Sequence, residues 1–200
     1  MQAEPGRSEV VGLGDSPTSK YFRDILADFK PGEEPLTPEA RQTLHETGQL
    51  AVHLRNLRCL PNGVPHVDLL PEPFKIIQTN AEILVLFEVG TNFRQIYTDG
   101  RKPPSHLSST WSGYSVGHWE GNILVVDTLG FKSGSWLDMR GHGHSEDLRV
   151  EERFQRRDFG HLDVSMTITD PKTFTKPVTI DFVEELLPDT DVLDRSCPFM

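Results

Sequence analysis

The chain has 200 residues, of which 20 are basic and 30 are acidic, so its formal net charge is −10 at neutral pH. This acidic balance argues against nucleic acid and against an anionic membrane surface as partners, because both require a basic face. The longest apolar run is Ile83 to Phe87, far shorter than the roughly 20 residues that a membrane-spanning helix needs. The length and the 36% of hydrophobic residues fit one structural domain.

Residues 1–70 are expected to form an N-terminal arm with two short helices that pack on the remainder. Residues 21–29 place apolar side chains on one helical face and end before a Pro-Gly pair. Thr37 is a suitable N-cap with proline at the first helical position, so a second helix is expected to begin there. We expect that helix to end near Thr47, with Gly48 as its stop, and residues 50–71 to form a loop.

The first residues lack the basic start and the apolar segment of a secretory signal peptide. The protein is therefore expected in the cytoplasm if Met1 is its natural start, and outside it if a signal was removed earlier. The two cysteines, Cys59 and Cys197, do not have the close spacing of a zinc site. They are either two unlinked thiols or one disulfide, which requires an oxidising compartment.

From Phe74 onward the pattern is that of short strands joined by tight turns. Apolar and polar residues alternate in several of them, as in residues 161–169, which is typical of an antiparallel sheet with one wet face. No helix of crossover length interrupts the series. Residues 71–200 are therefore predicted to form an antiparallel up-and-down β-barrel, and the whole chain to be mainly β. The candidate strands are residues 74–79, 82–89, 93–98, 114–119, 122–129, 147–156, 161–169, 177–186 and 191–196.

A barrel of this size has an interior that holds either packed side chains or one small ligand. One group of unusual residues lies in the strand 114–119, where alternation places Tyr114 and His118 on one face and Trp119 on the other. On a concave face, Tyr114 and His118 would supply a proton donor and a group that titrates near neutrality. The alternative is that His118 is an ordinary polar residue of a hairpin and that the aromatic residues belong to the core.

A second group lies in the segment 136–147, which joins two strands at the mouth of the predicted barrel. His142 and His144, with Asp138 or Glu146 as the carboxylate, have residue types that bind divalent metals. The same residues also suit cofactor-free acid–base chemistry, in which Asp138 or Glu146 orients a catalytic imidazole. A solvated turn without a function is the third interpretation.

A third group, in residues 93–101, offers Arg94 or Tyr97 to hold a ligand oxygen. An arginine in a sheet more often pairs with a neighbouring carboxylate, and this chain has many. The aromatic residues Trp111, Trp119 and Trp136 are the expected apolar contacts of a substrate. The chain has no nucleophile elbow, no dinucleotide or phosphate-binding glycine loop and no His-Glu-x-x-His motif.

Several ordered motifs together resemble a large family of uncharacterised bacterial proteins. The motifs are Gly117-His118-Trp119-Glu120-Gly121 followed by Leu124-Val125-Val126, the run from Phe93 to Arg101, the run Asp170-Pro171-Lys172, and the segment around Cys59. The resemblance covers roughly residues 17–197. It implies a lipocalin-like, calycin-type barrel that is exported in most members, and a disulfide between Cys59 and Cys197. It implies no established activity. Relatives often lack the His142-Gly143-His144 pattern, and the position of His118 can be lysine.

The leading hypothesis is a cofactor-free lyase, isomerase or cyclase that binds a small, largely apolar molecule in the barrel. His118, His142 or His144 would move a proton, Asp138 or Glu146 would orient the imidazole, and Tyr114 or Tyr97 would donate to a substrate oxygen. The first alternative is a non-catalytic carrier of an apolar molecule. The second is a metal-dependent enzyme that uses His142, His144 and Glu146. The sequence leaves the oligomeric state open, with a homodimer as one option.

Overall fold

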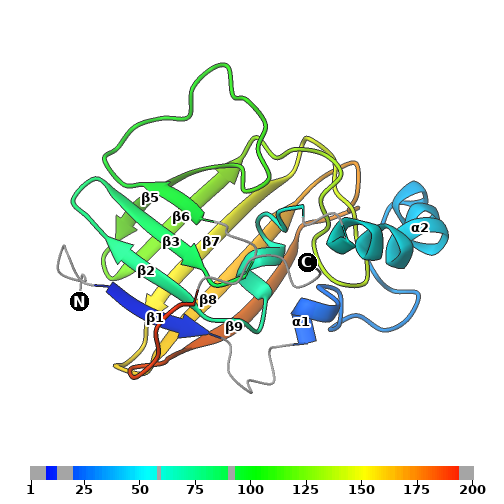
Figure 1. The fold of residues 1–200 in the computed structure, drawn as a ribbon. Coiled ribbons are helices and arrows are strands. Elements are labelled where there is room, and N and C mark those ends of the chain that lie inside the picture. Colours follow the sequence, from blue (N-terminus) through cyan, green and yellow to red (C-terminus); the bar gives the residue numbers. More distant parts are fainter. Residues whose placement is uncertain (1–7, 13–19, 58–59, 90–92, 194–200) are drawn as a thin grey trace.

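The computed structural model describes residues 8–12, 20–57, 60–89 and 93–193. Most of these residues belong to, or pack against, one curled sheet (Figure 1). The strands are β1 (Ser8–Gly12), β2 (Phe74–Gln78), β3 (Glu82–Phe87), β4 (Phe93–Tyr97), β5 (Tyr114–Glu120), β6 (Ile123–Leu129), β7 (Arg149–Arg156), β8 (His161–Thr169) and β9 (Val178–Leu186).

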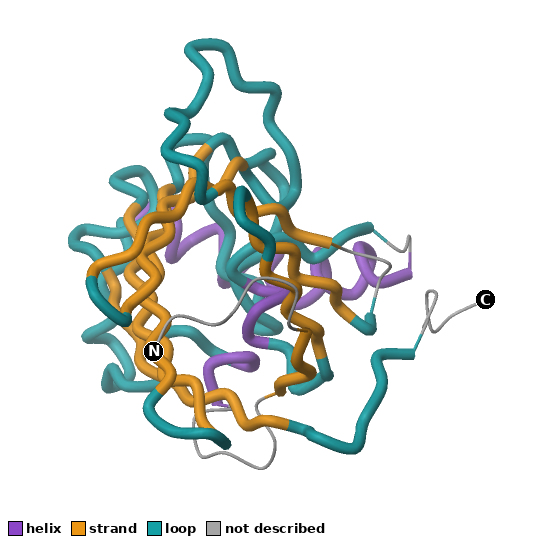
Figure 2. Tube along the Cα trace, turned by 90° about the vertical axis from the view of Figure 1, so that its left-hand side faces the viewer, coloured by secondary structure: helices purple, strands orange, loops and turns teal. Residues whose placement is uncertain are grey.

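The strands follow one another around a closed barrel in chain order. The eight strands β2–β9 form a curled, mostly antiparallel sheet, and β1 pairs with both of its edges, β2 and β9. Viewed from the side opposite the long helix, the strands form a ring with that helix behind it (Figure 2). The predicted mainly-β, barrel-like fold is confirmed at this level.

One junction departs from the predicted up-and-down pattern. β4 and β5 run parallel, and only Ile96 with Ser115 and Tyr97 with Val116 are paired. The connection between them, residues 98–113, is a long loop that extends beyond the sheet (Figure 1). A parallel pair cannot be joined by a tight hairpin turn, because the chain has to return to the end at which it started.

Alternation along the strands separates the inside of the barrel from its outside, as expected from the sequence. In β8 the inward residues Val164, Met166 and Ile168 are buried, and they join β9 residues such as Ile180 and Phe182 in one apolar core. The same core includes residues from before the sheet, such as Tyr21, Ile25 and Leu36. The N-terminal segment therefore shares its core with the barrel.

The first expected helix is shorter than the apolar pattern suggests. The helix α1 spans Lys20–Arg23 and is followed by turns. The backbone N–H of Ile25 donates to Asp138 Oδ2 at 2.8 Å, and that of Leu26 donates to the side chain of Asp24 at 2.9 Å. Because these donors bond side chains, they do not extend the helical ladder, and the helix ends.

The second helix is longer than expected. α2 spans Pro38–Leu57 and therefore continues through Gly48, the predicted stop, into the predicted loop. Its start is as predicted, since the N–H of Ala40 donates to Thr37 Oγ1 at 3.2 Å. A Cβ at Gly48 would lie 2.9 Å from the carbonyl oxygen of Arg140. The glycine thus permits close packing of α2 on the 138–143 loop rather than ending the helix.

The C-terminal prediction is wrong where it can be compared. Residues 191–193 form no strand, and residues 194–196 lie outside the described part of the chain. The ninth strand comes instead from Ser8–Gly12, in the segment expected to be a helical arm. Within the described residues, no helix has the length and apolar character needed to cross a bilayer.

The contact between α2 and the 138–143 loop gives a test. Gly141 has φ +93° and a Cβ there would lie 2.4 Å from backbone atoms of Gly48. We expect Gly141→Ala to lower the free energy of unfolding by at least about 3 kcal/mol, since it adds a backbone clash to the cost of positive φ. The matched control is Gly32→Ala, at φ +89° with no atom within 4 Å. Equal losses for the two variants in chemical denaturation would contradict the close contact.

Candidate active site

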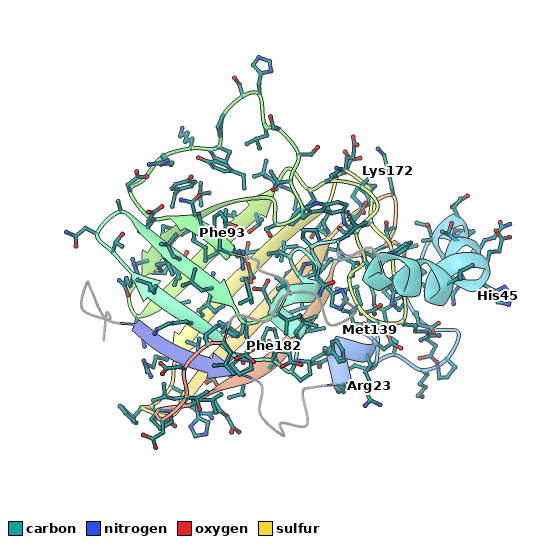
Figure 3. All side chains as sticks on the ribbon, in the orientation of Figure 1. Arg23, His45, Phe93, Met139, Lys172 and Phe182 are labelled. Atoms are coloured by element: carbon teal, nitrogen blue, oxygen red, sulfur yellow. The ribbon has the colours of Figure 1, made fainter. Side chains whose placement is uncertain are left out.

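The barrel encloses a cavity of about 130 Å³ with mostly apolar walls. Its lining reaches the β2–β3, β5–β6 and β7–β8 turns through Gln78, Asn122 and Gly160, and we call this end the mouth. These turns lie on the side of the barrel away from α2 (Figure 1). The apolar lining includes Phe74, Ile76, Ile83, Val85, Ile96, Trp119, Leu124, Phe154, Leu162, Val164, Phe182 and Leu186. Phe182 is labelled on β9 in Figure 3. Four charged side chains, Asp68, Arg94, Arg156 and Glu184, also line this cavity, together with His161.

Arg94 is 2% exposed and lies on the inner side of β4. Its guanidinium binds the Glu152 carboxylate through both terminal nitrogens, with Nη1 donating at 2.9 Å. Nε donates to Ser115 Oγ at 3.2 Å, and Nη2 also donates to Thr128 Oγ1 at 2.8 Å. Burial opposes its charged form, but the carboxylates of Glu152 and Asp68 hold the pKa of Arg94 above its ordinary value. The guanidinium is therefore a fixed cation inside the barrel.

Asp68 reaches the cavity from outside the sheet. It belongs to the short 3₁₀ helix η2 (His66–Leu69), whose other residues His66, Val67 and Leu69 are buried. Arg94 Nη1 donates to Asp68 Oδ2 at 3.4 Å. Burial raises the pKa of Asp68 to about 7, against the opposing effect of the Arg94 guanidinium and with a further rise from the Glu152 charge. Near neutral pH this carboxyl is therefore present in both protonation states.

Glu184 lies at an inward position of β9 and is 1% exposed. Neither of its carboxyl oxygens has a hydrogen-bond partner among the described residues. Burial, and then the charge of Asp68, raise the pKa of Glu184 well above its ordinary value. A buried carboxyl in an apolar wall is more stable protonated than ionised. Burial thus favours the protonated form of Glu184, whose side chain lines the cavity.

The two carboxyls differ in their surroundings. The Arg94 guanidinium favours the ionised form of Asp68, whereas burial and the charge of Asp68 both raise the pKa of Glu184. Two titratable groups with different affinities for a proton are the usual basis for assigning an acid and a base in an active site. The arrangement can donate a proton to a bound molecule and remove another from it.

Two of the predicted substrate contacts lie at this cavity. Arg94 and Trp119 both line it. Arg94 pairs with carboxylates, as the sequence suggested, but inside the barrel rather than on its surface. The other three candidates, Tyr97, Trp111 and Trp136, are outside the lining; Tyr97 stacks on Tyr114 with 5.2 Å between ring centroids, and Trp111 lies under Lys132. Trp136 pairs with Gly143 through an isolated bridge.

Tyr114 and His118 lie on the outer face of β5, away from the cavity. The inward residues of this strand are Ser115, Gly117 and Trp119. His118 has an exposed fraction of 58%, and its Nε2 lies 3.3 Å from Glu120 Oε1. The expectation that Tyr114 and His118 face a concave site is therefore corrected. Small residues at 115 and 117 leave room for Arg94 and Ile96 of the adjacent strand.

In the 136–147 segment, Asp138 orients His142, as one of the predicted pairings had it. His142 Nδ1 lies 2.6 Å from Asp138 Oδ2, and both side chains are buried. Asp138 Oδ1 also accepts the backbone N–H groups of Arg140, Gly141 and His142. This carboxylate therefore organises the loop, because its oxygens are all used by protein donors.

His144 and Glu146 do not join that pair. His144 Nε2 bonds the buried Ser135 hydroxyl and its Nδ1 lies 2.8 Å from the carbonyl oxygen of Ser145, while Glu146 is exposed. The predicted metal set of His142, His144 and Glu146 is therefore not assembled. Among the described residues, the one group with metal-like spacing is Asp24, Asp138 and His142. Its carboxylates already accept backbone N–H groups and the Arg140 side chain, so the group fits a structural clamp better than a metal site.

The expected disulfide between Cys59 and Cys197 lies outside the described residues, as both positions do. The residues that sequence reasoning missed are the three carboxylates of the cavity network: Asp68, Glu152 and Glu184. Glu152 and Glu184 could have been recognised from the sequence, because each is a charged residue at an inward position of an alternating strand. Asp68 could not, since it lies in a short 3₁₀ helix without such a pattern.

No protein-family model, curated protein or solved structure matches the chain significantly. The cavity is therefore interpreted from its own chemistry.

The buried ion pair gives a test of stability. Arg94→Met would leave Glu152 charged and unpaired at 0% exposure, so we expect a loss of about 3–5 kcal/mol in the free energy of unfolding. The double variant Arg94→Met with Glu152→Leu should recover most of it, because neither charge remains. Arg101→Met, which breaks an exposed pair with Asp99, should leave the free energy of unfolding almost unchanged, because solvent screens an exposed pair. A loss at Arg94 as small as that at Arg101, measured by urea denaturation, would rule out this stabilising role.

Glu184 predicts a pH dependence. Its pKa is raised in the folded state, so between its unfolded and folded pKa values the folded protein binds more protons, and stability falls as pH rises. Glu184→Met removes this contribution. The free energy of unfolding of the variant relative to the wild type should therefore increase from pH 5 to pH 8. Glu185→Met, at an exposed position of the same strand, should show no such trend in parallel denaturation series.

Proposed function

We propose that this protein is a cofactor-free acid–base enzyme of the lyase, isomerase or cyclase type. It binds a small, largely apolar organic molecule inside a calycin-type barrel. The observation that carries the proposal is Glu184, a buried carboxyl whose oxygens have no partner among the described residues and which lines the cavity with Asp68. The acid–base roles thus move from the loop histidines of the sequence hypothesis to carboxyls of the cavity.

The size of the cavity limits the substrate. An enclosed cavity of ~150 Å³ accommodates one benzene-sized molecule, and this one measures about 130 Å³. A single six-membered ring therefore fills it, with any longer part of the molecule directed to the mouth. The apolar walls favour the ring by removing it from water, and they fix its orientation relative to the polar end.

In the proposed mechanism, Glu184 donates its proton to an oxygen or a carbon of the bound molecule. Asp68, ionised through its contact with Arg94, accepts a proton from a neighbouring carbon. The Arg94–Glu152 pair acts as a positioning element. Arg94 remains neutralised by Glu152 while its Nη1 donates to Asp68 and holds that carboxyl in place. Transfer of one proton between the two carboxyls restores the starting state.

A carrier is the second candidate, favoured by the predominance of apolar side chains in the lining. The two candidates differ in what they do to a bound molecule. A carrier binds a ring compound and releases it unchanged, whereas an acid–base enzyme exchanges protons between the compound and solvent.

The test uses cyclohexanone in D₂O at pH 7, followed by NMR. We expect the protein to accelerate deuterium incorporation at the carbons next to the carbonyl, with Glu184 donating to the oxygen and Asp68 removing the proton. Glu184→Gln keeps the size of the side chain but removes the acid and should reduce the rate by at least tenfold. Glu185→Gln, on the outer face of the same strand, is the matched control and should leave the rate unchanged.

Binding of cyclohexanone is measured on the same samples by saturation-transfer NMR. Binding without any exchange would overturn the enzyme in favour of the carrier. Exchange that survives Glu184→Gln and Asp68→Asn but disappears in Glu185→Gln would place the chemistry outside the cavity and refute the proposal.

A further inference from the structure

Two carboxyls, Asp68 and Glu184, and two guanidiniums, Arg94 and Arg156, line the cavity. Glu152 neutralises Arg94 through two hydrogen bonds. The charge of Asp68 acts on Glu184 and helps to raise its pKa. Ionisation of either of these two carboxyls therefore places negative charge against mostly apolar walls.

The other two basic groups of the lining, Arg156 and His161, lie beside the β7–β8 turn and already have partners. Arg156 donates to the carbonyl oxygens of Asp158 and Phe159 at 3.2 and 2.8 Å, and His161 Nδ1 lies 2.7 Å from Asp158 Oδ1. His161 pairs with Glu185, the residue after Glu184. Even so, neither group donates to Glu184, whose carboxyl oxygens have no partner among the described residues.

The lining of the same cavity also includes four aromatic side chains. They are Phe74, Phe154, Phe182 and Trp119. The faces of aromatic rings carry partial negative charge and attract cations, and the attraction is stronger where water is excluded. A positive charge on a bound ring would therefore be stabilised by the ring faces and by the ionised carboxyl together.

From these observations we infer that the cavity is built for a reaction that passes through a positively charged, carbocation-like or oxocarbenium-like, state of an uncharged alcohol, alkene or ketone. This inference rests on the proposed function and names its substrate class. Anionic molecules are excluded from the class, because Arg94 is already paired and the remaining charge repels them. An organic ammonium ion of the same size resembles the charged state and should bind more tightly than the neutral substrate.

With an alcohol as substrate, the proposed reaction is a dehydration. The Glu184 carboxyl donates its proton to the hydroxyl oxygen, the C–O bond breaks with its electron pair on oxygen, and water leaves. Asp68 then removes a proton from the adjacent carbon, and the C–H electron pair becomes the second bond of the alkene. The proton gained by Asp68 returns to Glu184, so the products are one alkene and one water.

The test compares three probes that share one ring: cyclohexylammonium, cyclohexanol and cyclohexanecarboxylate. Binding to the wild-type protein is measured by isothermal titration calorimetry at pH 6 and pH 8. We expect cyclohexylammonium to bind at least tenfold more tightly than cyclohexanol at pH 8, and the carboxylate to bind more weakly than either. The advantage of the ammonium should shrink at pH 6, because Asp68, with a pKa of about 7, is then mostly neutral.

Asp68→Asn and Glu184→Gln should each reduce the advantage of the ammonium over the alcohol, and Glu185→Gln should not. The wild-type comparison alone decides the inference even if a cavity variant does not fold. Equal or tighter binding of cyclohexanol would overturn the cationic state and leave the proposed acid–base function standing. If none of the three probes binds, the proposed function fails as well.

Discussion

The two-point contact between Arg94 and Glu152 is the interaction on which the interior of this barrel depends. An arginine at an inward position of β4 is tolerated only because β5, β6 and β7 each supply an acceptor for it. All five N–H groups of the guanidinium can be used in this way. Its contact with Asp68 also ties η2 to the sheet. The polar end of the cavity is thus a consequence of one buried cation.

Burying these charged groups inside the barrel costs free energy of folding. Buried ion pairs seldom stabilise a protein more than apolar residues of the same shape, and an unpaired carboxyl such as Glu184 costs free energy outright. A barrel that served only as a folded core would fill these positions with aliphatic side chains, as β8 does. Buried titratable groups with shifted pKa values are concentrated at functional sites, because a reaction needs groups that hold or release protons there.

The strands were predictable from the sequence because alternation is a local signal, and β2–β9 begin and end within two residues of the expected ranges. β1 was not, since Ser8–Gly12 becomes a strand only by pairing with both edges of a distant sheet. At the site, Glu152 and Glu184 broke the alternation visibly, but which face of β5 points inward depends on the pairing register. The observed register places Trp119 at the cavity and leaves His118 exposed.

The parallel junction between β4 and β5 has a mechanical consequence. The backbone contributes two residue pairs here, as it also does between β1 and β9, whereas the other neighbouring strands are joined by longer ladders. Arg94 lies on the β4 side of this junction, and its side chain donates hydrogen bonds to Ser115, Thr128 and Glu152 on the other side. The wall beside the cavity is therefore closed by side chains as much as by backbone, and the buried Arg94 network helps to hold the barrel together.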